Sequence, residues 1–490
     1  MKKILALVLM SVLILSVFSG CGSGTVQTGS SAVSTVTGPD KITLSGNTAK
    51  YSGKGVVING NVITINAEGE YVLTGKLDDG QVVVNTGETA QSVYLYLENA
   101  DLTCLTAPAI YILQAKKVHI VLPEGTSNRI VSGTPSDMEN FDKNASGGAI
   151  YGEDDIDIEG EGSLEILGYI NNGITGKDDV QIEGGTISIT AANNGIRGSE
   201  SVTVSGGSIT LTCGNDGLKS TSADKEGKGF VQIDGGSLDF TVGGDGISAE
   251  TELVINGGDI SVTTTGDSLL SSCKAIKANN TLTINGGTLR LSSDDNTISS
   301  NEAVFITDGQ IVSASSSRKG IHADEKIRIS GGSVEITAVE EGIQTRGDVE
   351  VTGGTIRVSS LEDSIKAGDK GDGTTTPVGT ITISGGDIVL FSTGDPMEAK
   401  LSILCSGGRV FGTGSPKNAK GADRGSEQAF VAVNLSGKEG DTIRVSGASG
   451  EWSEVTTRDY NYIFFSAPEL VSGQEYTIEA GNSSITVEAK

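Results

Sequence analysis

Histidine, proline and aromatic side chains are scarce in this chain of 490 residues. It has two histidines, eight prolines and one tryptophan, beside ten tyrosines and ten phenylalanines. The two histidines, His119 and His322, are too few for a zinc site built from several imidazoles. The small number of prolines excludes a collagen-like triple helix, which needs proline-rich triplets with glycine at every third position.

Basic residues are also few compared with acidic ones. The chain has 35 lysines and arginines against 62 aspartates and glutamates, so its formal net charge is −27. A nucleic-acid-binding protein normally presents a basic stripe, and we therefore expect no nucleic-acid partner. Acidic oxygen atoms without imidazole ligands favour hard cations, so calcium is the cofactor that this composition predicts.

Only the N-terminus contains a long apolar run. The segments MKK and ILALVLMSVLILSVF are typical of a signal peptide, which we place at residues 1–20. Small residues then precede Cys21, as in a bacterial lipobox, with Phe18 in place of the usual leucine. We predict an extracellular lipoprotein anchored to the cell membrane through lipidated Cys21 alone; an ordinary secretory signal is the alternative. Residues 21–40, rich in Ser, Thr and Gly, predict a flexible tether.

Four further cysteines follow the tether: Cys104, Cys213, Cys273 and Cys405. An exported chain can form disulfides, and four cysteines allow three pairings. Their neighbours have the pattern of apolar strands, so we expect mostly free, buried thiols.

Glycine is abundant, with 70 residues, and it follows a period. The phrase apolar-x-apolar-x-Gly-Gly-x-apolar-x-apolar recurs with small departures, as in VQIEGGTISI, VTVSGGSITL and IRISGGSVEI. Its first glycine falls at positions such as 184, 206, 235, 257 and 286, so a period of 22 residues alternates with longer intervals. A fixed period of this length is typical of stacked repeats, and the alternation around the glycines predicts two short strands with a bend between them.

These repeats predict an all-β protein. We expect a parallel β-helix over residues 41–411, in which each repeat stacks on the one before it. The remaining residues, 412–490, contain alternating segments such as TIRVSG and YTIEAG and predict a small antiparallel β unit that caps the helix. We expect a monomer.

Acidic residues recur at a fixed distance from the glycine pairs and would form a column in stacked repeats. The predicted members are Asn194, Asp216, Asp245, Asp267, Asn296, Lys319, Glu341, Asp363 and Asp395. Asp and Asn are ordinary turn residues that bond to their own backbone, which is the simpler interpretation. Stacked carboxylates repel one another, however, and a bound cation relieves that repulsion. The predicted calcium ligands are Glu340, Glu341, Glu362 and Asp363, followed by Asp216, Asp245 and Asp267.

Basic residues occur three positions after some members of this column. Arg197, Lys219 and Lys366 are therefore candidates for contact with carbohydrate, or else form surface ion pairs with the acidic column. Aromatic residues gather near the C-terminus instead, where core packing is their simplest role. Trp452 and Tyr460 are the two candidates there for contact with sugar.

The phrases SRKGIHADEKIRISGGSVEIT, EEGIQTRGDVEVTGGTIRVSS and FFSAPELVSGQEYTI resemble those of bacterial surface carbohydrate-binding proteins with a polysaccharide-lyase-like β-helix. The resemblance covers nearly the whole mature chain. It implies a right-handed, single-stranded parallel β-helix that contains calcium and binds cellulose and pectin-type polymers such as polygalacturonate. The calcium ligands carry over to Glu341 and Asp363 and to other acidic column members, although Ser364 replaces the glycine of the family phrase.

Three functions remain open from the sequence. The first is calcium-dependent binding of cell-wall polysaccharide without catalysis. The second is a calcium-dependent pectate lyase, in which Lys219 or Lys366 would remove the proton next to the uronate carboxyl. Neighbouring carboxylates oppose that role because they favour a charged lysine. The third is a passive surface adhesin or spacer.

Overall fold

The computed structural model describes residues 39–87, 91–139, 147–315, 317–338, 340–368, 378–415, 421–423 and 425–490. The predicted signal peptide, Cys21 and most of the predicted tether lie outside these residues. The described residues all belong to one unit, Pro39–Lys490, which is all-β apart from one short helix, α1 (Pro135–Glu139). In this described part, no helix has the length and apolar character needed to cross a membrane.

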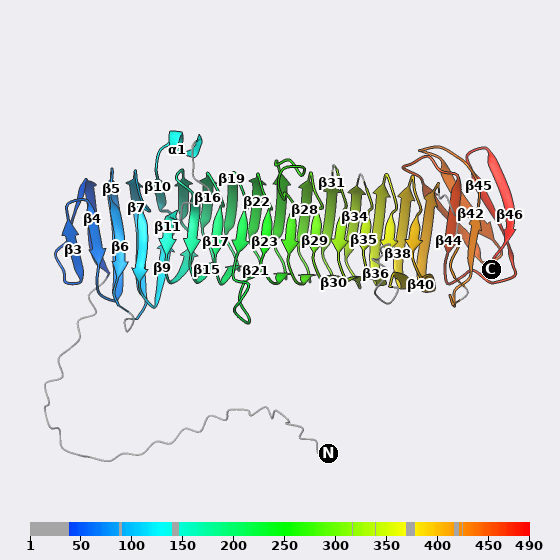
Figure 1. Cartoon of the computed structure of the whole chain (residues 1–490), viewed down its shortest axis with the longest axis horizontal. Helices are drawn as coiled ribbons and strands as arrows, with labels where there is room; N and C mark the ends of the chain where they lie inside the picture. The colour runs from blue at the N-terminus through cyan, green and yellow to red at the C-terminus, as the bar shows by residue number, and fades with distance from the viewer. Residues whose placement is uncertain are drawn as a thin grey trace, which may run out of the picture. The chain divides into compact units, whose positions relative to one another are not determined.

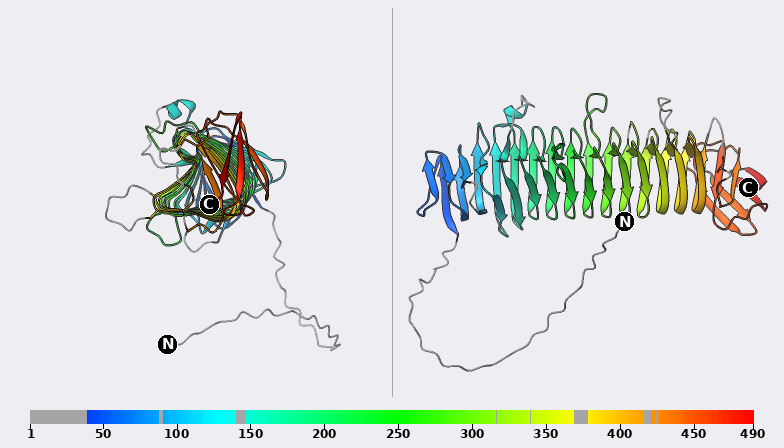
Figure 2. Two further views of the ribbon diagram at one scale, coloured as in Figure 1. Left: turned by 90° about the vertical axis from the view of Figure 1, so that its right-hand side faces the viewer. Right: turned by 60° about the horizontal axis from the view of Figure 1, so that its bottom comes forward.

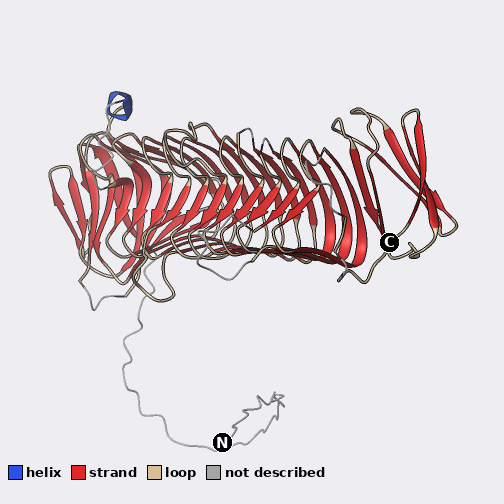
Figure 3. Ribbon diagram, turned by 45° about the vertical axis from the view of Figure 1, so that its right-hand side comes forward, coloured by secondary structure: helices blue, strands red, loops and turns tan. Residues whose placement is uncertain are grey.

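Two large sheets contain the repeats, and parallel pairing predominates in both. Most repeats contribute one strand to a 15-stranded sheet and two strands to a 27-stranded sheet, and the Gly-Gly bend separates those two; in β36 (Asp348–Ser360), β38 (Thr380–Ser392) and β40 (Ser402–Gly414) a single long strand runs through the bend. Strands of successive repeats lie side by side in Figures 1 and 3, and they superimpose in the end-on view of Figure 2. The prediction of an all-β protein with parallel strands is confirmed.

The 15-stranded sheet holds the third strand of each repeat. Its members are β3 (Val56–Asn59), β4 (Val62–Ile65), β6 (Gln81–Asn85), β8 (Ile110–Gln114), β11 (Gly148–Gly152), β14 (Asn172–Gly176), β17 (Ile196–Gly198), β20 (Leu218–Ser220), β23 (Ile247–Ala249), β26 (Ile276–Ala278), β29 (Ile298–Ser300), β32 (Ile321–Ala323), β35 (Ile343–Thr345), β37 (Ile365–Ala367) and β39 (Met397–Ala399).

The 27-stranded sheet holds the other two strands of each repeat and the strands at both ends of the array. Its members are β1 (Asp40–Gly46), β2 (Thr48–Lys50), β5 (Gly69–Leu77), β7 (Val93–Cys104), β9 (Lys117–Leu122), β10 (Ser127–Ser132), β12 (Asp155–Gly160), β13 (Ser163–Gly168), β15 (Asp179–Ile182), β16 (Thr186–Ala191), β18 (Ser201–Val204), β19 (Ser208–Cys213), β21 (Phe230–Ile233), β22 (Ser237–Val242), β24 (Leu253–Ile255), β25 (Asp259–Thr264), β27 (Leu282–Ile284), β28 (Thr288–Ser293), β30 (Ala303–Ile306), β31 (Gln310–Ser315), β33 (Lys326–Ile329), β34 (Ser333–Ala338), β36 (Asp348–Ser360), β38 (Thr380–Ser392), β40 (Ser402–Gly414), β41 (Phe430–Val433) and β44 (Tyr462–Ser466).

The register between repeats follows the sequence period. Thr186 of β16 pairs with Ser208 of β19, and Ser208 pairs with Ser237 of β22. The second step is longer because an insertion lies between the two repeats, yet equivalent positions still face one another. Insertions therefore leave the stack as loops and do not disturb the pairing.

The second glycine of each pair is the one that the bend requires. Gly185 has φ of 89° and Gly309 has φ of 110°, a region that side chains with a Cβ rarely adopt. The first position tolerates replacement, since Asp308 occupies it in the repeat that contains Gly309. The backbone conformation thus explains why the second position is glycine in every repeat that contains this phrase, whereas the first position is not.

Apolar side chains alternate with polar ones along each strand and fill the space between the sheets. In β16, Ile187 and Ile189 are buried, whereas Thr186 and Ser188 are exposed. The buried side chains form a single cluster that runs from Ile42 to Phe464. Its members come from every repeat, so the core is continuous along the stack. The four cysteines after the tether are buried free thiols, as the sequence predicts.

Antiparallel pairing replaces parallel pairing near the C-terminus. Strand β44 runs antiparallel to both β40 and β41. A four-stranded antiparallel sheet follows, made of β42 (Thr442–Gly447), β43 (Gly450–Val455), β45 (Glu475–Ala480) and β46 (Ser483–Glu488). These strands cover a second apolar cluster that includes Phe411, Phe465 and Tyr476.

Inserted loops flank the 15-stranded sheet at both ends of its strands. The connections from β10 to β11 and from β25 to β26 precede strands of this sheet, and those from β20 to β21 and from β37 to β38 follow them. Because the strands are parallel, α1 and the connection after β25 lie at one end of the strands, and the connection after β20 lies at the other. Figure 1 shows α1 and the loop after β25 projecting on one side and the loop after β20 on the opposite side.

The continuous core gives a direct test of the stack. Phe240 of β22 is fully buried between the sheets, so Phe240→Ala should lower the free energy of unfolding by about 3–5 kcal/mol. Thr241→Ala, at the adjacent exposed position, should change it by less than about 0.5 kcal/mol. Urea unfolding of both variants measures the difference. Equal effects would show that the two positions do not face opposite sides of the strand.

Candidate functional site

A line of polar side chains runs along the 15-stranded sheet, two residues before the first paired isoleucine, leucine or methionine of each strand. We name this line the polar ladder. Its members are Asn172, Asn194, Asp216, Asp245, Lys274, Asn296, Lys319, Glu341, Asp363 and Asp395. Most are buried; Asp216 is 5% exposed and Asp245 is 3% exposed.

The side-chain oxygens of the ladder accept backbone N–H groups of the next repeat, and not N–H groups of their own turn. The Asn194 backbone N–H donates to Asn172 Oδ1 at 2.9 Å, and the Asp245 N–H donates to Asp216 Oδ1 at 2.8 Å. Asp363 Oδ1 likewise accepts the N–H of Asp395 at 2.8 Å. An unpaired buried N–H is costly, so an Asp or Asn oxygen at this position satisfies a structural need. The local turn bond expected from the sequence is replaced by a bond between repeats.

Asp267 is not a member of the ladder, so its predicted place there is wrong. The insertion precedes the strand in this repeat, and Lys274 occupies the ladder position instead. Asp267 Oδ1 accepts the N–H of Leu269 at 2.8 Å and so fixes the inserted turn. This turn presents Leu269 and Leu270, which are 85% and 84% exposed, beside the sheet.

The central side chain of each strand in the 15-stranded sheet points outward. We name this line the outer column; from β14 onward its members are Thr175, Arg197, Lys219, Ser248, Lys277, Ser299, His322, Gln344, Lys366 and Glu398. The three predicted basic residues all lie in it. The register also extends the column backwards from Thr175 to Tyr151 and Tyr111, whose rings are 5.5 Å apart.

Lys366 lies at the centre of a group of carboxylates. Its Nζ is 2.9 Å from Asp363 Oδ2, 3.0 Å from Glu341 Oε1 and 3.2 Å from Glu398 Oε2. Burial alone would lower the pKa of Lys366, but the hydrogen bonds with Asp363 and Glu341 raise it above its usual value. The ammonium group therefore stays charged and occupies the space between Glu341 and Asp363, where the sequence predicted a cation.

Three of the other predicted acidic residues, Asp216, Asp245 and Glu340, are also paired with lysines. Lys219 Nζ lies 2.6 Å from Asp216 Oδ2, and Lys319 Nζ lies 2.6 Å from Glu340 Oε2. Asp245 accepts hydrogen bonds from the Lys274 N–H and the Ser272 hydroxyl. Burial, and then repulsion from Asp216, raises the pKa of Asp245, which is the repulsion expected between stacked carboxylates.

One acidic group remains close enough to share a cation. Among the described residues, Asp363, Asp395 and Glu398 place their ligand oxygens within 4.8 Å of one another. Of the seven predicted ligands, Asp363 alone belongs to this described group. Burial, and then the hydrogen bond with Glu398, raises the pKa of Asp363, and the same hydrogen bond lowers the pKa of Glu398. Oxygen donors of this kind fit calcium.

The two C-terminal aromatic candidates lie away from the outer column. Trp452 packs against Phe465 with ring centroids 5.1 Å apart. Tyr460 is 3% exposed and its hydroxyl donates to Asp441, and its burial raises its pKa. Both side chains contribute to the second apolar cluster, which agrees with the packing role expected for these aromatics.

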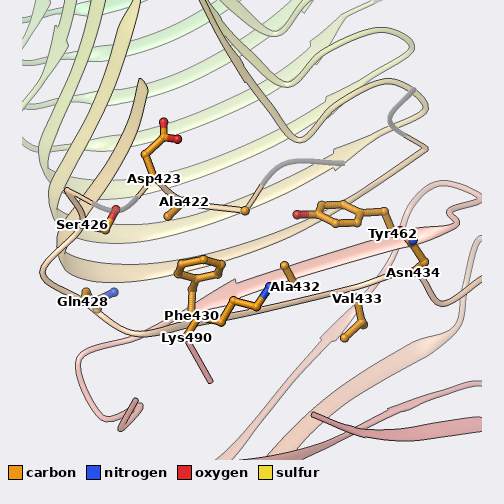
Figure 4. Close-up of a pocket in the computed structure, with 11 residues that line it drawn as sticks. Ala422, Asp423, Ser426, Gln428, Phe430, Ala432, Val433, Asn434, Tyr462 and Lys490 are labelled. Carbon is orange, nitrogen blue, oxygen red and sulfur yellow. The ribbon is translucent and has the colours of Figure 1, made fainter. Parts of the chain in front are cut away.

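A cavity of about 730 Å³ opens where the last repeat meets β41 and β44 (Figure 4). Its aromatic lining, Phe430 and Tyr462, belongs to the continuous core. Its polar side chains hold the backbone: Asp423 accepts the Ile403 N–H, and Gln428 donates to the Gly408 carbonyl. We therefore interpret this cavity as the end of the core and not as the functional site.

Sequence reasoning missed Tyr111, Tyr151, Lys274 and Lys277. The signal for three of them was present in the phrases AIYILQ, AIYGED and AIKANN, which match GIRGSE around Arg197. An alignment on this phrase would have placed Lys277 in the outer column. Counting from the glycine pair failed there because the insertion lies between the two landmarks.

The fold and the site define an all-β protein that presents the same positions repeatedly along one charged face. A comparison with protein families gives a match to carbohydrate-binding domain-containing proteins over residues 59–318 and 311–485. These ranges cover most of the sequence, and the chain belongs to this family.

A relative from Acetivibrio thermocellus, described as a carbohydrate-binding domain-containing protein, is 33% identical over 192 residues. The alignment covers 39% of this chain and 65% of the relative's length. Among solved structures, a gadolinium derivative of the polysaccharide lyase-like protein from C. thermocellum is 31% identical. That alignment covers 50% of this chain and 96% of the other, with a TM-score of 0.46.

The ladder can be separated from a metal site by two substitutions at one position. Asp216→Asn keeps the oxygen that accepts the Asp245 N–H, whereas Asp216→Ala leaves that buried N–H without its partner. We expect Ala to cost about 1–3 kcal/mol of unfolding free energy and Asn less than half of that. Denaturant unfolding with and without calcium measures both. If Asp216→Asn lost as much unfolding free energy as Asp216→Ala, and only with calcium present, Asp216 would be identified as a metal ligand.

Proposed function

We propose that the protein binds an extended polysaccharide along the outer column of the 15-stranded sheet and does not cleave it. The observation that carries this proposal is the pairing of the column lysines with carboxylates. Membership of the carbohydrate-binding family supplies the ligand class. The outer column offers repeated polar positions along one sheet, and exposed Leu269 and Leu270 lie beside it.

The lysine contacts argue against the lyase alternative. A catalytic base must lose its proton near neutral pH and reach the substrate. Lys366 contacts three carboxylates; burial lowers its pKa, but the hydrogen bonds with Asp363 and Glu341 raise the pKa above its usual value. Lys219 is held by Asp216 at 2.6 Å. Neither lysine has the environment of a base, although both can donate hydrogen bonds to sugar hydroxyls.

We further propose that the stacked repeats form a right-handed, single-stranded parallel β-helix capped by the antiparallel strands of residues 412–490. The constant register between repeats and the bend at each second glycine support this architecture. In the same proposal, Cys21 carries a lipid and residues 21–40 tether the binding domain outside the cell. The sequence pattern around Ser19, Gly20 and Cys21 supports the anchor.

Calcium is proposed at Asp363, Asp395 and Glu398 and not between Glu341 and Asp363. The closeness of the three ligand oxygens supports this position, and a small cavity of about 130 Å³ adjoins Asp395 and Glu398. A bound calcium ion would neutralise carboxylates that Lys366 alone does not balance. The polymers proposed are cellulose and pectin-type chains.

Binding and cleavage are separated by two assays on one sample. We expect the protein to sediment with insoluble cellulose or with polygalacturonate gel, and to release no unsaturated product from polygalacturonate with or without calcium. Ultraviolet absorbance of the double bond follows the product. A product that disappears in Lys219→Ala or Lys366→Ala would establish the lyase instead. Failure to bind any polysaccharide would favour the adhesin or spacer.

The calcium site should add stability that depends on pH. At calcium 100-fold above its dissociation constant, the free energy of unfolding should rise by about 2.7 kcal/mol. The pKa of Asp363 is raised, so this increment should be present above that pKa and disappear as falling pH protonates the carboxyl. Thermal unfolding with calcium and with chelator measures it.

Glu398→Gln should abolish the calcium increment, and Glu362→Gln is the matched control. Glu362 is exposed and stands outside the group of three, so its replacement should leave the increment intact. If the calcium-dependent stabilisation survived in Glu398→Gln and vanished in Glu362→Gln, the result would favour the calcium ligands predicted from the sequence over the group of three.

A further inference from the structure

Charge is distributed unevenly along the outer column. At the β37 end, the single ammonium of Lys366 contacts Glu341, Asp363 and Glu398. At the β17 end, Arg197 and Lys219 are direct neighbours in the sheet register, and Asp216 is the carboxylate paired with Lys219. The column therefore changes from an excess of acid at one end to an excess of base at the other.

Arg197 differs from Lys219 and Lys366 because the ladder residue three positions before it is uncharged. Lys219 and Lys366 each follow a ladder aspartate by three residues, and each forms an ion pair with it. Arg197 follows Asn194, whose side-chain oxygen serves the ladder by accepting the Asp216 N–H but carries no charge. Within the described residues, Arg197 forms no ion pair; its Nη2 donates to the Thr221 hydroxyl at 3.4 Å.

We propose that Arg197 is the carboxylate-binding residue of the polysaccharide face, and that it selects uronate-bearing chains at the β17–β20 end without calcium. This inference rests on the proposed function and assigns the acidic ligand a place on the same face. A guanidinium matches the geometry of a carboxylate and forms strong charge-assisted bonds with it. The partly exposed Arg197 side chain can reach such a ligand, and neighbouring Lys219 adds a second donor.

The acidic end of the column has the opposite effect. Like charges disfavour a uronate beside Glu398 and Glu341, unless a cation intervenes. An acidic chain should therefore contact the β17–β20 end, whereas a neutral chain can follow the whole column. The two polymer classes would share a face and differ in the part of it that they use.

Two asparagines of the ladder offer a pair of variants, which differ in that Asn194 Nδ2 also donates to Asn172 Oδ1 at 3.0 Å. Asn194→Asp would supply Arg197 with the internal partner that Lys219 already has in Asp216. Asn296→Asp adds the same charge at the same ladder position, but the outer residue three positions later is Ser299. Asn296 Oδ1 also accepts the next N–H, from Lys319 at 3.3 Å, so both changes keep the oxygen acceptor. Arg197→Gln removes the guanidinium directly, and Arg290→Gln makes the same change of charge in β28 of the other sheet.

The experiment measures affinity for polygalacturonate, for its methyl ester and for a neutral β-glucan in excess chelator, with melting temperatures as a check on folding. We expect Asn194→Asp and Arg197→Gln to weaken polygalacturonate binding about tenfold and to leave the other two ligands unchanged. Asn296→Asp and Arg290→Gln should change it less than about twofold. If Asn194→Asp fails to fold, Arg197→Gln decides alone.

Three results would overturn the inference and leave the proposed function standing. They are equal losses in Asn194→Asp and Asn296→Asp, equal wild-type affinity for polygalacturonate and its methyl ester, or polygalacturonate binding that requires calcium. Wild-type binding to the neutral glucan but not to polygalacturonate would likewise overturn the inference and leave the proposed function standing. The measurements are repeated with calcium, and absence of binding to all three polysaccharides under both conditions would refute the proposed function itself.

Discussion

The backbone bond between one repeat and the next is the constraint on which the rest of the structure depends. Each repeat must place its strands in the register of its neighbour, and each buried N–H at the turn needs an acceptor from the repeat before it. Asn172, Asn194, Asp216 and Asp363 meet that need with side-chain oxygens. The acidic character of the ladder is thus first a consequence of stacking. Its charge becomes available for other purposes because Asp and Asn serve equally well as acceptors.

The charge of a ladder residue affects the basic side chain of the outer column that follows it. Where the ladder residue is an aspartate, the lysine three residues later is held in an ion pair, as in Lys219 and Lys366. Where the ladder residue is an asparagine, as at Asn194, the basic residue three positions later has no ion-pair partner on the ladder, and its charge is available to a ligand. The identity of a ladder residue therefore decides whether the basic residue three positions later is held in an ion pair, and the proposed binding face can vary while the stacking is unchanged.

The sequence predicted the strands and the bends because period and alternation are local properties that the register repeats. It also placed Arg197, Lys219 and Lys366 on one line, since equal offsets stack. It failed at Asp267 because an insertion can lie on either side of a landmark, and spacing alone does not say which. Ion pairs of Lys366 with the acidic column were one of the two roles predicted for it, and the structure contains them. The sequence did not show that its ammonium lies between Glu341 and Asp363, where a cation was predicted, because it does not show where a flexible side chain ends. Tyr111 and Tyr151 were missed because their repeats lack the glycine pair used for counting.

The pairing of each strand with its counterpart one repeat away has a consequence for how such a chain can grow. Contacts between strands are overwhelmingly between neighbouring repeats, so the addition of a repeat in register disturbs only the two repeats that it separates. The insertion between Ser208 and Ser237 shows that even a partial addition leaves the register intact. The length of the proposed binding face is therefore a quantity that gene duplication can adjust in steps of one repeat. A polymer of many identical sugars is the kind of ligand for which a longer face adds contacts of the same sort.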